Sequence, residues 1–523
     1  MLIVRTRFAI CSVLGIGAVF IGTVGGLHLY KKPKIYTKPV VDSVYSLNPR
    51  NTRTRLDYMT ARAILGQFLQ YNDFGEIVPS VFESWRIEDN GRKYIFKIRK
   101  NVRFHSGKLF SVDDAIFTLH YLAVPSSLVA SFFSDIAGCN SFIEGKAKDI
   151  SGIRALDKES FQITLRRSSY VFLTMLADPK ILIVPDRLNG LSEAEFFKKP
   201  DGVGPYFLDE ILQEGKRLIL KRNPHYFGGM PAIHQYVLQT MEKEQAKEAF
   251  TKGKVDDLEM FMLTDEESKV LKDVGPSYST SSYSTAFAFL NGRNRAFHSL
   301  PVRKLMKSAV DAKDIRAHCR IPIVESSGII PQGVMGWINP KYQESNTADP
   351  KPVQSAKEYL QRIGKKTIEI MYYGEENDQC SIHRLGNTLE HALEIKVRYS
   401  HLSIEEAIKR FSNAHYDILI DNLSLRGREP AHLFTFFDPA SPHNLTHFTD
   451  KNITRMLEKI HANPIRGLRT VQYMELNRYI SEEMVYVLPL FSDIRHFAFS
   501  KRVKSETAPM TIMGYVGFER ISL

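Results

Sequence analysis

The sequence predicts an α/β fold, because strand-like and helix-like patterns alternate along its 523 residues. Between residues 84 and 104, apolar residues alternate with polar ones on both sides of Asn90-Gly91, which is typical of a β-hairpin with a two-residue type I′ turn. Around Pro301, apolar residues recur at the spacing of a helix. The chain is long enough for two or three domains, and its 43% hydrophobic and 24% charged residues are ordinary for globular proteins.

A helix is predicted shortly after the hairpin. Ser111 and Asp114 have the spacing of a capping box, in which each side chain satisfies the other's free backbone amide. Ile116, Leu119 and Leu122 then fall on one face. The helix is therefore expected to begin at a defined residue and to have one buried side.

The rest of the chain continues this mixture. Strands are predicted over 203–221, with a turn near Glu214-Gly215, and a helix over 242–251 that stops at Gly253. A second helix begins at Pro301 and has one apolar face, formed by Val302, Leu305, Met306, Ala309 and Val310. A long helix marked by Tyr473, Leu476 and Ile480 and a strand over 485–491 follow near the end of the chain. No stretch has the composition of a long interdomain linker, so we expect short crossings between domains.

The N-terminus predicts export from the cytoplasm. Arg5 and Arg7 precede an apolar, uncharged stretch of about 23 residues, from Phe8 to Tyr30. This length also suffices to cross a bilayer. Residues 1–30 are therefore interpreted as a signal peptide or an N-terminal membrane anchor, and the sequence leaves the choice open. Cys11 lies at the start of the stretch, which makes it a poor lipidation site.

The cysteines exclude a disulfide scaffold and any CxxC metal or redox site. Beyond Cys11, the chain has only Cys139, Cys319 and Cys380, far apart and odd in number. In an oxidising compartment at most one bridge can form, with one thiol left over. The sequence does not decide which pair it joins.

Charge and motifs exclude several classes of function. The formal net charge is +12, but the basic residues are dispersed and no zinc-finger or RNA-binding signature accompanies them, so no nucleic-acid partner is expected. The chain has no G-x-S-x-G elbow, H-E-x-x-H motif, P-loop or dinucleotide fingerprint. We therefore expect neither an enzyme nor a bound metal or cofactor. His105 lies in a predicted loop and is given a structural role.

Three blocks of sequence carry a family resemblance. They are 78–122, with Glu83-Ser84-Trp85 and the run from Tyr94 to Gly107; 202–229, with Gly202-Val203-Gly204-Pro205-Tyr206 and Asn223-Pro224; and 289–311, with Phe289-Leu290-Asn291 and Ala309-Val310-Asp311. In this order they resemble the extracellular solute-binding proteins that include the oligopeptide- and dipeptide-binding components of ABC-type importers.

The resemblance implies a periplasmic binding protein-like fold, with two lobes around a ligand cleft, an additional domain on the first lobe and two hinge crossings. The implied organisation is lobe I from 36–52, 179–283 and 492–523, the extra domain from 53–178, and lobe II from 284–491. Two crossings would allow the lobes to close on a ligand by hinge motion.

The resemblance also points to ligand-facing residues. In peptide-binding relatives, an aspartate of the second lobe receives the peptide's ammonium group, and the matching stretch is 417–430. If Glu429-Pro430 matches the family's acidic-Pro pair, Arg426 occupies the aspartate's position, with Asn422 and Ser424 beside it. An arginine there favours a carboxylate or phosphate over an ammonium. Two alternatives stay open: Arg426 or Arg428 pairs with Glu429 at the surface, or Asp421 is the displaced amine acceptor.

The first lobe contributes two further candidates. Ser46 and Asn48 match the segment that enters the first lobe beside the cleft, where they could hydrogen-bond a ligand. The Asn48-Pro49 pair is also typical of a turn.

The function implied by the resemblance is capture of a peptide or related small ligand in the periplasm and delivery to an ABC permease of the inner membrane, by a monomer. The alternatives are a membrane-anchored sensor or docking protein with the same fold, or a binder of a non-peptide anionic ligand. The family that the chain resembles also includes carriers of metal or haem, but the spacing of the histidines does not support such a function here.

Overall fold

The structure is a computed structural model that describes residues 33–326, 328–339, 350–373, 379–425, 427–504 and 517–523. The strands are β1 (Ile35–Val40), β2 (Leu69–Tyr71), β3 (Ile77–Pro79), β4 (Phe82–Glu88), β5 (Lys93–Ile98), β6 (Ile153–Ala155), β7 (Ser160–Thr164), β8 (Tyr206–Leu212), β9 (Arg217–Arg222), β10 (Gln235–Thr240), β11 (Ser277–Leu290), β12 (Ile323–Glu325), β13 (Thr367–Tyr373), β14 (Lys396–Leu402), β15 (Ile418–Ser424) and β16 (Val487–Ala498).

The helices lie between these strands, as expected for the α/β class. They are α2 (Arg55–Leu65), α3 (Val112–Leu122), α4 (Cys139–Ile143), α5 (Leu173–Leu176), α6 (Glu193–Phe196), α7 (Lys243–Thr251), α8 (Asp265–Leu271), α9 (Leu300–Ala309), α10 (Ala312–Cys319), α11 (Pro350–Arg362), α12 (Gln379–Leu393), α13 (Ile404–Ser412), α14 (Lys451–His461) and α15 (Arg466–Arg478).

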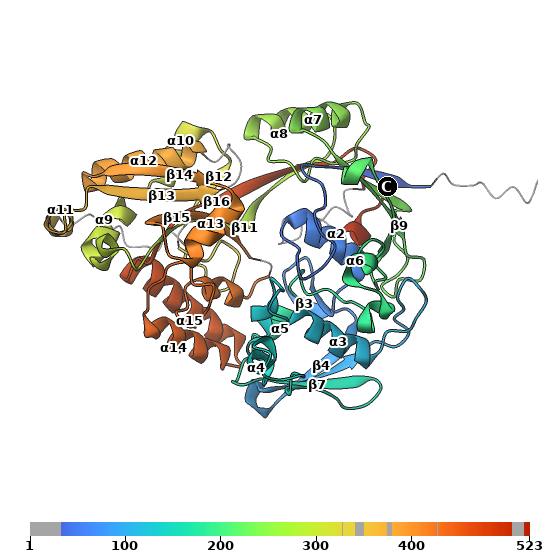
Figure 1. The fold of residues 1–523 in the computed structure, drawn as a ribbon. Coiled ribbons are helices and arrows are strands. Elements are labelled where there is room, and N and C mark those ends of the chain that lie inside the picture. The colour runs from blue at the N-terminus through green and yellow to red at the C-terminus, as the bar shows by residue number, and fades with distance from the viewer. Residues whose placement is uncertain (1–32, 327, 340–349, 374–378, 426, 505–516) are drawn as a thin grey trace, which may run out of the picture.

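Across the described ranges the strands form four sheets. Their strand orders are β1-β10-β9-β8, β4-β5-β7-β6, β2-β3 and β12-β16-β11-β15-β13-β14. The first three sheets lie in one lobe and most of the six-stranded sheet lies in the other (Figure 1). The chain is therefore bilobal, as predicted.

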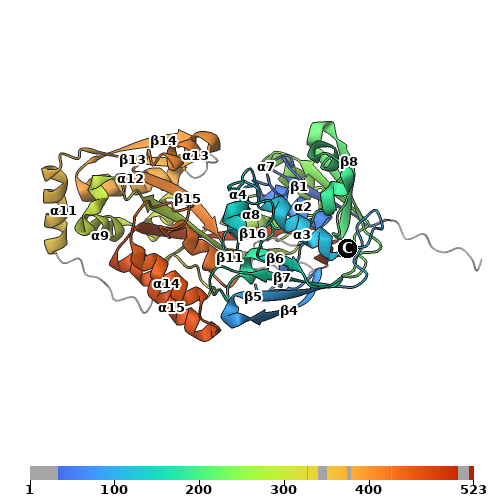
Figure 2. The same cartoon turned by 60° about the horizontal axis from the view of Figure 1, so that its bottom comes forward.

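Separate hydrophobic cores stabilise the two lobes. One large cluster joins buried side chains from Tyr36 to Leu238 with Phe497, Phe518 and Ile521 near the C-terminus. Two further clusters cover the two faces of the six-stranded sheet and draw on residues 286–491. On one of these faces α14 and α15 pack side by side (Figures 1 and 2). The exact lobe and extra-domain boundaries stay a prediction.

Two long strands cross between the lobes. β11 and β16 pair antiparallel, from Ser277 opposite Ala498 in the first lobe to Phe289 opposite Val487 in the second. Their register is irregular between Ser281 and Thr285, near the middle of the crossing. The two predicted crossings are thus confirmed, and β16 continues seven residues past the predicted strand end at 491.

The first hairpin forms as predicted, but its turn is longer. Glu88 pairs with Lys93, so four residues connect β4 to β5 instead of two, and Asp89, Asn90 and Gly91 all have positive φ. The type I′ assignment was therefore wrong. The β8–β9 hairpin has the same type of turn, with positive φ at all three residues of Gln213–Gly215.

The helices begin and end close to the residues predicted from the sequence. Ser111 and Asp114 form both hydrogen bonds of the capping box of α3. Pro301 lies in the first turn of α9, and Gly253, with φ of +66°, follows α7. The last predicted helix corresponds to α15, which is extended by a π-helical turn at Tyr479–Glu483. These ends depend on local side chains, which is why the sequence alone indicates them.

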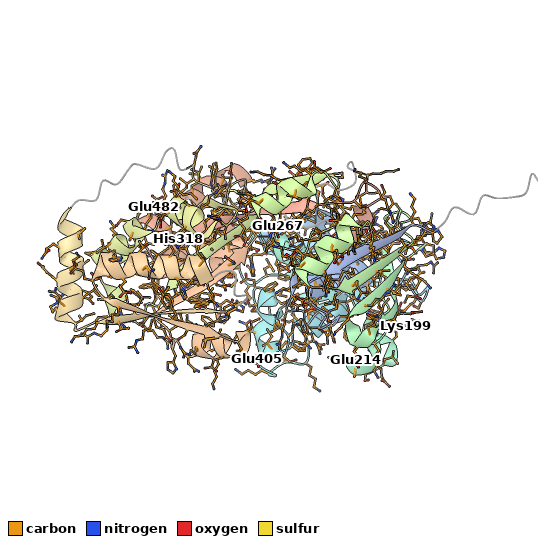
Figure 3. All side chains as sticks on the ribbon, turned by 90° about the horizontal axis from the view of Figure 1, so that it is seen from above. Lys199, Glu214, Glu267, His318, Glu405 and Glu482 are labelled. Atoms are coloured by element: carbon orange, nitrogen blue, oxygen red, sulfur yellow. A yellow bond between two sulfur atoms is a disulfide. The ribbon has the colours of Figure 1, made fainter. Side chains whose placement is uncertain are left out.

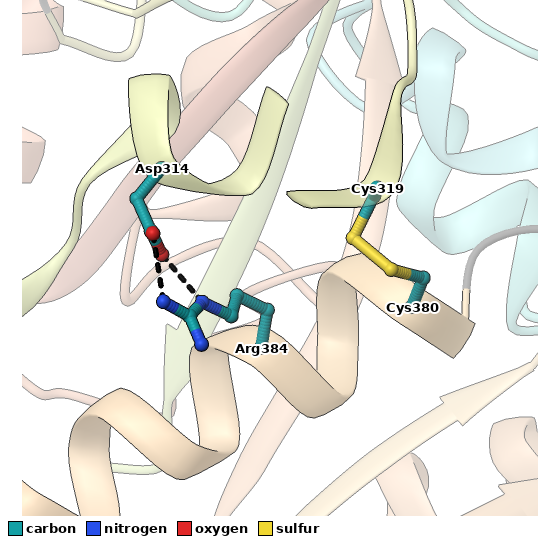
Figure 4. Close-up of a disulfide and its surroundings, with 4 residues drawn as sticks. All are labelled: Asp314, Cys319, Cys380 and Arg384. Carbon is teal, nitrogen blue, oxygen red and sulfur yellow. Dashed lines mark hydrogen bonds and ion pairs between the residues drawn. A yellow bond between two sulfur atoms is a disulfide. The ribbon is translucent and has the colours of Figure 1, made fainter. Parts of the chain in front are cut away.

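One disulfide fastens the second lobe. Cys319, the last residue of α10, is bonded to Cys380 in the first turn of α12, with a Cα–Cα distance of 5.7 Å (Figure 4). Beside it, the Arg384 guanidinium binds both carboxylate oxygens of Asp314 at 2.5 and 2.7 Å. Cys139 is free and buried, and burial raises the pKa of its thiol to about 11. The bridge that the sequence left open therefore joins Cys319 to Cys380.

The leader prediction for residues 1–30 lies outside the described residues. From residue 33 onward, apart from the gaps given above, no helix has the length and apolar character needed to span a membrane.

Candidate functional site

Strand β15 presents backbone groups that its neighbours do not use. It pairs with β11 along its whole length, and the Leu425 N–H donates to the Tyr283 carbonyl oxygen at 2.7 Å. Because backbone hydrogen bonds alternate in direction along an antiparallel pair, the carbonyl groups of Asn422 and Ser424 face away from β11. On that side, β13 pairs only with Ile418 and Leu419. Within the described strands, the end of β15 is thus an open edge.

Asn422 and Ser424 lie on this open edge with exposed side chains. The Asn422 N–H is already occupied, because it donates to Asp421 Oδ1 at 2.7 Å. An extended ligand that pairs with this edge would therefore use the Asn422 carbonyl and both backbone groups of Ser424. This is the type of contact by which a strand is added to a sheet edge.

Asp421 is a partly buried carboxyl beside this edge. Burial raises its pKa to about 6, although the Tyr373 hydroxyl and the Asn422 N–H both donate hydrogen bonds to it. No salt bridge to it is found among the described residues. Its geometry is compatible with the alternative in which Asp421 accepts an amine.

Arg426, the predicted specificity residue, lies outside the described residues. Its neighbour Glu429 is bound by Arg469, at 3.0 and 3.2 Å, in a largely buried ion pair. Arg428 instead contacts the Tyr283 hydroxyl, and its Nε has no hydrogen-bond partner in the described part of the chain. Among the described residues, Glu429 is thus paired with Arg469 and forms no ion pair with Arg428, whereas its pairing with Arg426 lies outside the described residues and stays a prediction.

Asn48 holds a turn in the first lobe. Its amide donates to Glu193 at 3.1 Å and accepts from the Arg50 N–H at 3.0 Å and from the Tyr121 hydroxyl at 3.1 Å. The side chain is buried. These contacts support the turn interpretation, since a ligand would have to replace one of them. The role of Asn48 as a ligand contact stays a prediction.

Ser46 is half-buried, and its hydroxyl accepts from the Asn48 N–H at 3.1 Å. The hydroxyl proton is not used in that contact, so Ser46 retains a donor. Its neighbour Tyr45 is 67% exposed.

His105 has a structural role in the described conformation. Its Nε2 lies 3.1 Å from the Gly204 carbonyl, and its Nδ1 accepts from the Gly202 N–H at 3.2 Å. Both glycines pack against the backbone of α2, where a Cβ at Gly202 would lie 2.0 Å from the Ile64 oxygen. The histidine therefore helps to hold one of the motifs that carry the family resemblance. Among the residues that could be searched, no group of three His, Cys, Asp or Glu could hold a metal ion.

Sequence reasoning missed a charged cluster near the crossing strands. Lys38 binds Asp257 at 3.1 Å and Glu259 at 2.5 Å, and all three side chains are at most 1% exposed. Arg55, at the start of α2, binds the other Glu259 oxygen at 2.8 Å. The two cations and the two carboxylates lie more than 200 residues apart in the sequence, and no local motif marks them.

The two lobes also touch at a second place, away from the crossing strands. The Arg428 N–H donates to the Gly75 carbonyl at 3.2 Å, and the Tyr170 N–H donates to the His461 carbonyl at 2.7 Å. Ser131 and His443 add a side-chain hydrogen bond of 2.6 Å. The described conformation therefore has the lobes in contact at these hydrogen bonds as well as joined by the crossing strands.

The comparisons with known proteins decide the family. The family described as "Bacterial extracellular solute-binding proteins, family 5 Middle" matches residues 76–388, more than half of the chain. The chain belongs to this family. Among its family 5 relatives, the periplasmic murein peptide-binding protein MppA of Escherichia coli is 21% identical over 476 residues, covering 88% of this chain and 87% of MppA.

Another relative is named for a different solute. The nickel-binding periplasmic protein of Escherichia coli is 26% identical over 259 residues, covering 47% of this chain and 46% of the relative. Among solved structures, Haemophilus influenzae OppA in complex with the peptide RPPGFSPFR has the same fold, with a TM-score of 0.79 at 16% identity, covering 94% of this chain and 99% of OppA. Family membership and bilobal fold are thus confirmed.

Proposed function

We propose that this protein is the substrate-binding component of an ABC importer, which captures a peptide or a related small solute outside the cytoplasmic membrane and delivers it to a permease. The observation that carries the proposal is the open edge of β15, because backbone pairing would hold an extended peptide with little regard to its side chains. Relatives named for peptide binding support it.

In this proposal, the ligand contacts are the edge residues Asn422 and Ser424, the first-lobe residues Ser46 and Asn48, and Arg426. Lobe I would comprise 36–52, 179–283 and 492–523, with 53–178 as its extra domain and 284–491 as lobe II. Closure over the solute would bring the edge against the first lobe and report occupancy to the permease.

The protein would act outside the cytoplasm, as a monomer without catalytic activity. The disulfide between Cys319 and Cys380 supports this compartment, because such bonds persist where the environment is oxidising. Residues 1–30 would direct export, and an uncleaved leader would keep the protein at the membrane. In the sensor alternative the same binding event would be read without transport.

The test is a thermal-unfolding screen of the full-length protein, purified with detergent where the leader is retained. The ligands are trialanine, N-acetyl-trialanine, small organic acids and sugar phosphates. At one hundred times its Kd, a bound ligand adds about 2.7 kcal/mol of stability, which is a readily measured shift. Stabilisation by free peptides supports peptide import. Stabilisation by blocked or anionic compounds alone supports an anionic solute, and no stabilisation by any class contradicts the proposal.

A further inference from the structure

Arg495 differs from three other arginines near the C-terminus. It lies on the crossing strand β16, opposite Thr280 of β11. Arg469, Arg502 and Arg520 each have a carboxylate partner, in Glu429, Asp256 and Asp73 respectively. Arg495 is partly buried, and the described residues offer it neither an ion pair nor a hydrogen bond. It is therefore a partly desolvated cation without a contacting anion among the described residues.

The nearest large carboxylate cluster cannot serve Arg495. The segment that carries it runs beside the end of β16, where Asp257 bridges to Phe499 and the Leu258 N–H donates to the Ala498 carbonyl at 3.0 Å. However, one Glu259 oxygen is bound by Lys38 at 2.5 Å and the other by Arg55 at 2.8 Å. Each oxygen of this carboxylate is therefore already paired with a cation.

Arg55 itself has binding capacity left. Its Nη2 is used by Glu259, but its Nε is buried and has no hydrogen-bond partner in the described chain. Arg55 lies in the same region as Arg495, because its partner Glu259 follows Leu258, whose N–H donates to Ala498 on the strand that carries Arg495. Burial first, and then the positive charge of Arg55, lower the pKa of Arg495. Asp493 and Glu259 oppose this effect without forming an ion pair with Arg495.

Two neighbouring guanidinium groups with free donors are suited to an oxyanion. A guanidinium presents its N–H groups in a fixed fork that matches the two oxygens of a carboxylate or phosphate. A cation that is removed from water without a counter-ion destabilises the protein, and an incoming anion would remove that cost. Because Arg495 lies on a strand that crosses between the lobes, such an anion would sit where both lobes can close around it.

We propose that Arg495, with Arg55 beside it, binds an oxyanionic group of the solute, a carboxylate or a phosphate. The inference rests on the proposed solute-binding function and defines one chemical group that the solute carries. It is independent of Arg426, because it uses residues of the first lobe and of a crossing strand.

The test compares full-length wild type with Arg495→Gln and with the control Arg86→Gln, an arginine that is 71% exposed. Thermal unfolding is followed with sodium phosphate, glycerol phosphate, succinate, trialanine and trialanine amide, each against sodium chloride at matched ionic strength. We expect one oxyanion class to stabilise wild type and the control but not Arg495→Gln. The affinity of the best probe should fall about 10- to 100-fold in Arg495→Gln.

The probes separate the two sources of the oxyanion. A response to trialanine that is lost with its amide identifies the peptide carboxylate, and a response confined to phosphate and glycerol phosphate identifies a phosphate. If Arg495→Gln does not fold, Arg495→Lys is decisive, because it retains the charge but loses the fork. A weakened response in Arg495→Lys supports the proposal, and an unchanged response overturns it.

Failure of this inference is distinguishable from failure of the proposed function. If trialanine and its amide stabilise wild type equally and phosphates have no effect, peptide capture stands and the oxyanion site is overturned. If only the phosphates stabilise wild type, and this effect is lost in Arg495→Gln, the oxyanion site stands and capture of a peptide is contradicted. If no probe stabilises wild type, both are overturned.

Discussion

Lys38 is an example of a charge that is stable in the interior only because of its partners. Its ammonium group is 1% exposed and lies between Asp257 and Glu259. We expect Lys38→Met to lower the free energy of unfolding by about 3–5 kcal/mol, since it leaves buried carboxylates short of a cation. Urea denaturation at neutral pH measures this change.

The matched control for this prediction is Lys252→Met. Lys252 and its partner Glu248 are both more than half exposed, so solvent screens their pair and the substitution should change the free energy of unfolding far less than Lys38→Met does. Equal stability of the two variants would show that the buried carboxylates take up protons at little cost.

Asp421 predicts a pH dependence near the open strand edge. Its folded-state pKa of about 6 lies above that of an unfolded aspartate, about 3.9. The folded state therefore binds the proton more tightly, and the stability of this site decreases as the pH rises through that interval. Asp421→Asn should remove this decrease and raise the stability at pH 7 by about 1–3 kcal/mol.

Chemical denaturation of wild type and Asp421→Asn between pH 4 and 8 is the measurement. Parallel stability curves would contradict the raised pKa. If Asp421 also accepts a ligand amine, Asp421→Asn should weaken the binding of trialanine but leave the binding of N-acetyl-trialanine unchanged. Equal weakening of both peptides would exclude that role.

At the scale of elements, the disulfide is the strongest cross-link between α10 and α12. It closes a loop with a sequence separation of 61 residues. Loss of such a loop constraint is expected to destabilise the protein by about 4 kcal/mol. We expect the Cys319→Ser/Cys380→Ser double variant to melt at a lower temperature than wild type, and reductant to lower the melting temperature of wild type only. A reductant effect of equal size in both proteins would place its origin elsewhere.

Elements with local signals were predictable, whereas long-range ones were not. The capping box of Ser111 and Asp114 lies within four residues, so it can be recognised without the fold. The pairing of Cys319 with Cys380 depends on how α10 packs against α12, which no local pattern encodes. The β4–β5 turn was mispredicted because Asn-Gly also fits a four-residue loop with three positive φ values.

The candidate site shows the same division. The family resemblance led to the stretch 417–430 and hence to the edge residues Asn422 and Ser424. Arg495 was missed because the strand was expected to end at 491, although β16 continues to Ala498. The partners of Arg55 and Lys38 lie more than 200 residues away in sequence, so their cluster exists only in the folded chain.

At the scale of the whole molecule, Gly427 lies where the lobes meet. A Cβ at this position would be 2.4 Å from the Tyr71 ring of the first lobe. We expect Gly427→Ala to disfavour the closed arrangement and to weaken solute binding about 10- to 100-fold, while the ligand-free protein unfolds as wild type does. Calorimetric titration with the best ligand measures the affinity.

Gly467→Ala is the control, because nothing lies within 4 Å of a Cβ there and the site is on the nearby helix α15. It should bind as wild type does. If Gly427→Ala also binds like wild type, contact between these surfaces is not required for solute binding.

The strand pairing of the first lobe has a consequence for biosynthesis. β1 pairs with β10, 200 residues later, and the Tyr236 hydroxyl donates to the carbonyl of Phe518. In a nascent chain, β1 therefore lacks its partner until residue 240 has been made, and the core of the first lobe is complete only when Phe518 has left the ribosome, whereas the two cores of the six-stranded sheet draw on residues 286–491. Chains that lack residues 517–523 should consequently be cut first by protease in their N-terminal half. Such delayed completion keeps the chain unfolded for longer, and an unfolded chain is the form that the proposed export through a secretion channel would require.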